Sequence, residues 1–125
     1  MKAAFTLLAP LLLAACATTP LADAAPAPVG TAVALGQSVS VGALVLTPLK
    51  VVTDSRCPIN ARCVWAGELV VSTQVDGPGW REVAELKLGE PKAVRGTNLM
   101  LSSGEPGRMA GAAETAPREY RFTFE

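Results

Sequence analysis

The stretch "ELVVSTQVDGPGWREVAELKL", residues 68–88, is the clearest indication of the fold class. Its first half alternates with a period of two, which predicts a strand whose inward face carries Leu69, Val71, Thr73 and Val75. The run 76–79 combines Asp, Pro and two Gly and predicts a turn. Its second half predicts another strand, with one face made of Trp80, Ala84, Leu86 and Leu88.

The rest of the chain repeats this pattern of short apolar runs separated by Gly and Pro. The runs that predict further strands are 31–35, 37–41, 43–46, 49–54, a weaker one at 97–101, and 118–125 with Tyr120, Phe122 and Phe124 inward. Outside the N-terminal segment, no window of about 12 residues has a helical period. We therefore expect an all-β domain, either a small antiparallel β-sandwich or a barrel, of about seven to eight strands.

The N-terminal residues 1–15 have the features of a lipoprotein signal peptide. Lys2 precedes an apolar run that is shorter than the ~20 residues of a membrane span. The sequence "LAAC", Leu13 to Cys16, resembles a bacterial lipobox, which implies that Cys16 is lipidated and becomes the new N-terminus. The alternative is an ordinary secretory signal in which Cys16 is incidental.

A lipidated Cys16 predicts a protein that is anchored to a membrane without spanning it. Ala17 differs from the Asp of an inner-membrane retention signal, so in a Gram-negative cell we expect the outer membrane, facing the periplasm. Residues 16–30 are rich in Ala and Pro and predict an extended tether. The remaining residues 31–125, about 95 in number, predict a single β domain.

Three cysteines occur in the chain, and lipidation of Cys16 leaves Cys57 and Cys63. Export to an oxidising compartment and a turn-forming "PINAR" between the two cysteines predict a disulfide that fixes the shape of one loop. The alternative is a thiol-redox or metal-handling protein in which Arg56 or Arg62 stabilises a thiolate, or Met100 or Met109 adds a soft metal ligand.

The motif "DSRCP…CVWAGE", Asp54 to Glu68, resembles one found in small exported bacterial proteins of uncharacterised function, many of them lipoproteins. The resemblance is specific for this segment and loose for the flanking strands. It implies an all-β domain and no known activity.

The same segment contains the candidate binding loop, with Asp54, Arg56, Arg62, Trp65 and Glu68. We expect Asp54 to pair with Arg56 or Arg62 and hold the loop, and the alternative is an exposed polar patch that grips a partner. We expect the Trp65 ring to pack against the disulfide or the core, and the alternative is an exposed binding anchor. Asp54 and Glu68 together would supply only half of a calcium site.

Residues 102–117 are long and low in apolar bulk, which predicts a mobile loop. Loops often hold binding residues, although a plain connection is the simpler interpretation.

Several classes of function are disfavoured by composition. The chain has no histidine, which excludes Ser-His-Asp and Cys-His arrangements, and Lys50, Lys87 and Lys92 lie in no nucleophile motif. Without Lys2 the net charge is about −1, so there is no basic field for nucleic acid. We therefore expect no catalysis and no cofactor. The prediction is an envelope binding or structural module whose partner is a protein, a polymer of the envelope or a small ligand.

Overall fold

The computed structural model describes residues 25–125. The predicted signal peptide, Cys16 and the first part of the tether lie outside the described residues. Residues 25–125 contain eight β-strands and one short 3₁₀ turn, which are β1 (Val39–Val41), β2 (Leu44–Asp54), β3 (Leu69–Gly77), β4 (Trp80–Lys87), β5 (Lys92–Val94), β6 (Thr97–Leu99), β7 (Leu101–Glu105), η2 (Pro117–Glu119) and β8 (Arg121–Phe124).

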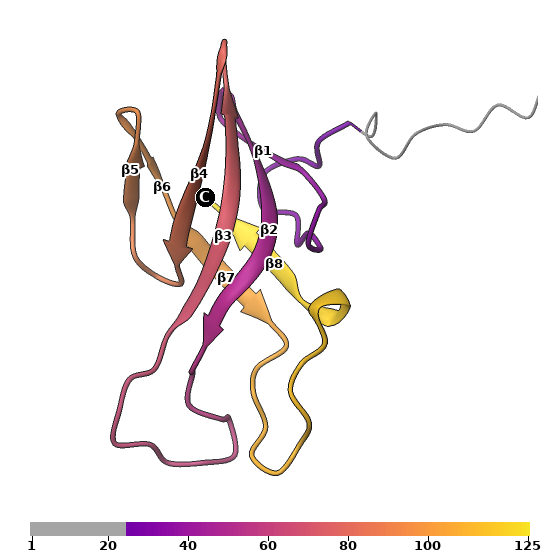
Figure 1. Cartoon of the computed structure of the whole chain (residues 1–125), viewed down its shortest axis with the longest axis vertical. Helices are drawn as coiled ribbons and strands as arrows, with labels where there is room; N and C mark the ends of the chain where they lie inside the picture. The colour runs from indigo at the N-terminus through magenta and orange to yellow at the C-terminus, as the bar shows by residue number, and fades with distance from the viewer. Residues whose placement is uncertain (1–24) are drawn as a thin grey trace, which may run out of the picture.

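A four-stranded antiparallel sheet with the order β1-β2-β3-β4 forms one layer (Figure 1). The predicted hairpin is confirmed: β3 and β4 pair along their length, and Gly77 opposite Trp80 leaves only Pro78 and Gly79 in the turn. The φ of Gly79 is +73°, a left-handed conformation that glycine adopts without strain.

The sequence pattern predicts separate strands at 43–46 and 49–54, but the structure has one strand, β2, which continues through Pro48. Proline removes a backbone donor, so it is tolerated only at an open edge or a bulge. Both conditions hold here, because β1 pairs with β2 only as far as Leu46 and a register shift falls between Pro48 and Lys50.

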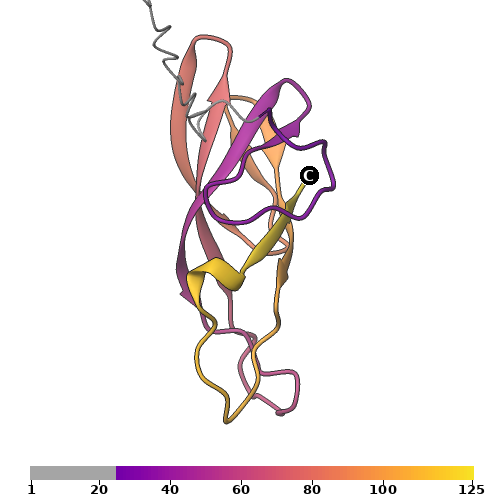
Figure 2. The ribbon, with the colours of Figure 1, turned by 90° about the vertical axis from the view of Figure 1, so that its right-hand side faces the viewer.

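The second layer is built from β7 and β8, which pair antiparallel and lie across one face of the large sheet (Figure 2). Val33 extends this layer on one side by a bridge to Phe122, and Leu88 extends it on the other by a bridge to Leu101. The hairpin β5-β6 completes the fold. The sheets stay separate and do not close into a barrel, so the all-β prediction is confirmed in its sandwich-like form.

The core lies between the two layers and consists of side chains from both. The inward faces predicted for β3, β4 and β8 are confirmed. The buried apolar residues are Val33, Val39, Leu44, Leu46, Leu69, Val71, Val75, Ala84, Leu86, Val94, Leu99, Leu101, Tyr120, Phe122 and Phe124.

Three segments differ from the prediction. The weak strand expected at 97–101 is divided between β6 and β7, and the predicted loop 102–117 begins with four residues of β7. The low content of apolar side chains in 102–105 does not indicate a loop, because Gly104 lies where a Cβ would overlap the side chain of Leu69. A small residue is needed at this contact between layers. The run 31–35 forms no strand and contributes only the bridge of Val33.

The beginning of the described chain lies at one end of the sheet. Ala27, predicted to belong to the tether, exchanges backbone hydrogen bonds with Ser38 and Ser40 and forms a bridge to Val39. Val39 pairs with Leu46, and Asp54 ends the same strand eight residues later, which at ~3.3 Å per residue is about 26 Å away. Residues 25–125 contain no helix with the length and hydropathy required for a bilayer span.

We predict that Phe122→Ala lowers the free energy of unfolding by about 3–5 kcal/mol, because the side chain is fully buried and its removal leaves a cavity. The control is Val83→Ala, at a side chain on β4 that is 60 % exposed, which should cost less than about 1 kcal/mol. Urea unfolding followed by fluorescence measures both. Equal losses for the two variants would contradict this assignment of the core.

Candidate functional site

Two loops meet at the end of the molecule opposite the first described residues (Figures 1 and 2). The stapled loop, residues 55–68, connects β2 to β3, and the second loop, residues 106–116, leads from β7 to η2. The N–H of Ile59 donates to the Arg108 carbonyl at 2.9 Å. The Asn60 side chain accepts from the N–H of Ala110 at 2.8 Å and donates to its carbonyl at 3.3 Å. These bonds hold the loops against each other.

The disulfide predicted between Cys57 and Cys63 is confirmed, with a Cα–Cα distance of 5.8 Å. A second closure lies at the base of the stapled loop. The Ser55 N–H donates to the Glu68 carbonyl at 2.7 Å, and the Glu68 N–H donates to Ser55 Oγ at 3.0 Å. Gly67 has a φ of +65°, and a Cβ there would overlap the Ser55 carbonyl, so this close approach requires glycine.

Arg56 is the residue that joins the two loops to the sheet. Its Nε and Nη2 donate to Asp54 Oδ1 and Oδ2 at 2.8 and 2.9 Å, a bidentate pair. Its Nη1 donates to the Gly104 carbonyl at 2.6 Å, and Nη2 also donates to the Pro106 carbonyl at 3.0 Å. The side chains of Arg56 and Asp54 are only 17 % and 9 % exposed. Of the two partners predicted for Asp54, the structure therefore has Arg56.

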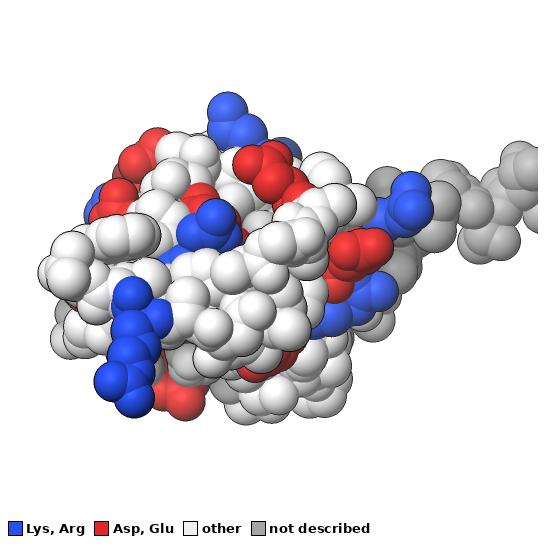
Figure 3. All heavy atoms as spheres, turned by 90° about the horizontal axis from the view of Figure 1, so that it is seen from below, with Lys and Arg blue, Asp and Glu red and all other residues white. Residues whose placement is uncertain are grey.

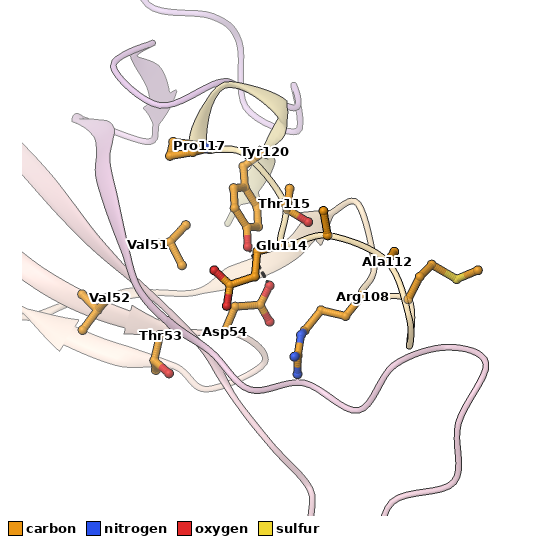
Figure 4. Close-up of a pocket in the computed structure, with 12 residues that line it drawn as sticks. Val51, Val52, Thr53, Asp54, Arg108, Ala112, Glu114, Thr115, Pro117 and Tyr120 are labelled. Carbon is orange, nitrogen blue, oxygen red and sulfur yellow. Dashed lines mark hydrogen bonds between the residues drawn. The ribbon is translucent and has the colours of Figure 1, made fainter.

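Tyr120 completes this cluster, and the sequence pattern does not predict its contact with Asp54. Its hydroxyl donates to Asp54 Oδ2 at 2.8 Å (Figure 4). Its ring stacks on that of Phe122, with centroids 5.5 Å apart. The alternation in "YRF" predicts that Tyr120 points into the core, but it does not indicate that the hydroxyl contacts a carboxylate.

The three groups shift one another's pKa. Burial on its own raises the pKa of the Asp54 carboxyl, but the hydrogen bonds from Arg56 and Tyr120 and the guanidinium charge outweigh it and hold the pKa below its ordinary value. The hydrogen bond to Asp54 raises the pKa of Arg56. Burial, followed by the bond to Asp54, raises the pKa of Tyr120. At neutral pH the cluster is a carboxylate held by one cation and one neutral hydroxyl.

The outer part of the stapled loop is apolar and exposed. Ile59 is 75 %, Val64 is 99 % and Trp65 is 59 % exposed, and these three residues are called the apolar tip below. Of the two places where Trp65 was expected to pack, the disulfide or the core, the core is wrong, and the ring is exposed as in the alternative. That expectation assumed a strand running from Cys63, whereas β3 begins only at Leu69. Figure 3 shows this end of the molecule, where uncharged residues cover most of the surface.

Arg62 and Glu68 stand apart from the Asp54 cluster. Arg62 is exposed, and Glu68 pairs with Lys87 Nζ at 3.3 Å on the neighbouring strand β4. Asp54 and Glu68 thus have different cationic partners, and they do not form the half calcium site considered above. In the part of the chain from 25 to 125, no three His, Cys, Asp or Glu side chains are grouped as a metal site would require. Met100 lies at the far end of β7 from the stapled loop, whereas Met109 lies on the second loop between Arg108 and Ala110, which bond to the stapled loop.

We predict that Asp54→Asn lowers the free energy of unfolding by about 2–4 kcal/mol, because Arg56 keeps its charge in a largely buried place after losing its paired carboxylate. The matched control is Asp76→Asn. Asp76 also accepts from an arginine Nε, but its partner Arg81 is 68 % exposed, so the loss should stay below about 1 kcal/mol. Similar losses in chemical unfolding of the two variants would contradict the structural role of the Asp54 cluster.

The lowered pKa of Asp54 also predicts an acid dependence of stability. Between the folded pKa and the ordinary value of about 3.9, the unfolded chain binds more protons than the folded chain, so stability rises with pH. The contribution of Asp54 is complete above the ordinary value and is lost as the pH falls through the folded one. Urea unfolding from about pH 2 to about pH 7 should show a shallower acid limb in Asp54→Asn than in the wild type. An unchanged acid limb would contradict this assignment.

In comparisons with known proteins, no family model matches the chain, and neither a curated protein nor a solved structure matches it. The resemblance of the segment 54–68 to exported bacterial proteins stays a prediction. The residues of the site are therefore the basis for assigning a function.

Proposed function

We propose that this protein is a lipid-anchored module of the bacterial cell envelope that binds another envelope protein through the apolar tip. The observation that carries the proposal is the exposure of Trp65, Val64 and Ile59 on a loop that is closed covalently and tied to its neighbour. Exposed apolar side chains lose water when a partner covers them. A loop that is already rigid gives up little conformational entropy on binding, so more of this free energy appears as affinity.

The chemistry of the tip favours a protein partner with a particular surface. Trp is among the residues that most often dominate the energetics of protein–protein interfaces, together with Tyr and Arg. The stapled loop and the second loop contain two glutamates, Glu68 and Glu114, and three arginines. Of these, Arg62 is exposed beside the apolar tip. The complementary surface is an apolar pocket whose rim carries carboxylates.

The position of the tip agrees with an anchor at Cys16. The first described residues pair at one end of the sheet, and the stapled loop begins about 26 Å further along β2. A tether that enters at the first end allows the apolar tip to face away from the membrane that holds the lipid.

The thiol-redox alternative has weaker support. Arg56, one of the two arginines expected to stabilise a thiolate, directs its N–H groups to Asp54, Gly104 and Pro106. Cys57 lies in an irregular loop rather than at a helix N-terminus, which is the usual place where a thiol pKa is lowered.

The proposal is tested by placing a photo-crosslinking amino acid at Val64 in the full chain, expressed in its own cells. We expect one discrete protein adduct that is lost with Trp65→Ala and reduced with Arg62→Glu. The same crosslinker at Val83, 60 % exposed on β4, is the control and should give no such adduct. Adducts with lipid alone, or a protein adduct that survives Trp65→Ala, would contradict binding through the apolar tip.

The anchor is tested separately. We predict that Cys16→Ala abolishes incorporation of a labelled fatty acid and moves the protein from the membrane fraction to the soluble fraction, because a lipid on this residue is the proposed attachment. Cys57→Ser is the control and should remain lipidated and membrane-bound. Membrane association that persists in Cys16→Ala would contradict lipid anchoring.

A further inference from the structure

A cavity of about 270 Å³ lies between the end of β2 and the second loop. Val51 and Val52 from β2 and Pro117 from η2 supply apolar wall, and Asp54 and Tyr120 lie at its inner side (Figure 4). Arg108 and Glu114 reach into the same region from the second loop (Figure 4). The volume is just below the ~300–1,000 Å³ typical of sites for drug-sized ligands, so the cavity suits a smaller molecule.

The charged groups at this cavity differ in whether they have an ionic partner. Asp54 is already neutralised by Arg56 in a bidentate pair. Within residues 25–125, by contrast, neither Arg108 nor Glu114 lies within 4.0 Å of an oppositely charged group, and the ion pairs formed involve other residues. The cavity therefore presents one cation and one anion that do not satisfy each other.

Arg108 is held in place for binding. Its Nη1 donates to the Arg56 carbonyl at 2.7 Å, and its own carbonyl accepts from Ile59 at 2.9 Å. A guanidinium has five N–H donors in a rigid fork, so one bond to a carbonyl restrains its position and leaves the remaining donors for a ligand. Glu114 lies on an exposed part of the loop and supplies a carboxylate, which only accepts hydrogen bonds.

We propose that this cavity binds a small zwitterion, an aliphatic amino acid or a dipeptide. Arg108 donates to the ligand carboxylate, which matches the fork of the guanidinium. Glu114 accepts from the ligand ammonium group, and the ligand's aliphatic part lies against Val51 and Val52. The charged lining residues are Asp54, Arg108 and Glu114, and Arg56, which lies outside the lining, neutralises Asp54. A ligand with one charge of each sign therefore leaves no net charge behind. This site is distinct from the apolar tip and does not depend on the proposed protein partner.

The test is titration of the ¹⁵N-labelled domain with L-alanine, L-leucine and L-leucyl-L-leucine, followed by amide chemical shifts. At least one of these probes should move the amides of residues 51–54 and 108–115 in a saturable manner. N-acetyl-L-leucine and L-leucinamide each lack one charge and should bind about tenfold or more weakly than leucine, because each leaves one partner unsatisfied.

Substitutions distinguish binding in the cavity from general effects on the protein. Glu114→Gln, at an exposed residue that should not disturb folding, is expected to weaken binding about tenfold, as is Arg108→Gln if its thermal unfolding stays cooperative. Arg118→Gln and Glu119→Gln, also exposed but not part of the cavity lining, are the matched controls and should leave binding unchanged. Absence of saturable shifts with all three probes, or binding that Glu114→Gln leaves unchanged, would overturn the proposal.

Discussion

The bidentate pair between Arg56 and Asp54 is the interaction on which this end of the molecule depends. Removing two charges from water costs free energy, and the mutual attraction offsets that cost only when the remaining donors and acceptors are also satisfied. Here the other guanidinium donors reach the Gly104 and Pro106 carbonyls, and the Tyr120 hydroxyl reaches the carboxylate. Throughout the described chain, every buried side-chain nitrogen or oxygen has a partner. The pair thus connects β2 with β7 through Arg56 and with the approach to β8 through Asp54.

This connection explains how a small domain presents a defined surface. The sandwich core ends at the level of Tyr120, and beyond it both loops extend without a regular strand of their own. The disulfide and the Ser55–Glu68 bonds shape the stapled loop. The Arg56 side chain, the bond from Arg108 to the Arg56 carbonyl and the contacts of Ile59 and Asn60 hold it to the second loop. The apolar tip and the cavity therefore depend on the same contacts between the two loops. The apolar tip lies on the outer side of the stapled loop, and the cavity lies between β2 and the second loop.

The sequence predicts much of the fold and less of the site, for physical reasons. Strands β3, β4 and β8 alternate because one face is buried, so period-two patterns reveal them. The pattern fails for β7, where contact between layers requires Gly104 rather than apolar bulk, and for Val33, which adds a single bridge.

In the site, the disulfide and an Asp54 salt bridge follow from residue types at short separation. Tyr120 and Arg108 could not be assigned, because their contacts are 66 and 52 residues away in sequence. The exposure of Trp65 was predicted only as the alternative, since alternation was extended into a segment that is not a strand.

Amide hydrogen exchange in the wild type and in Arg56→Lys is the most direct measurement of the connecting role of Arg56. Lysine keeps the charge but lacks the planar fork that reaches Asp54, Gly104 and Pro106 together. The amides of Ile59 and Ala110, which bond across the two loops, should lose protection together, by about tenfold or more, while the amides of β3 and β4 stay protected. Unchanged protection at both amides, or loss at only one of them, would contradict the view that Arg56 holds the two loops as a single unit.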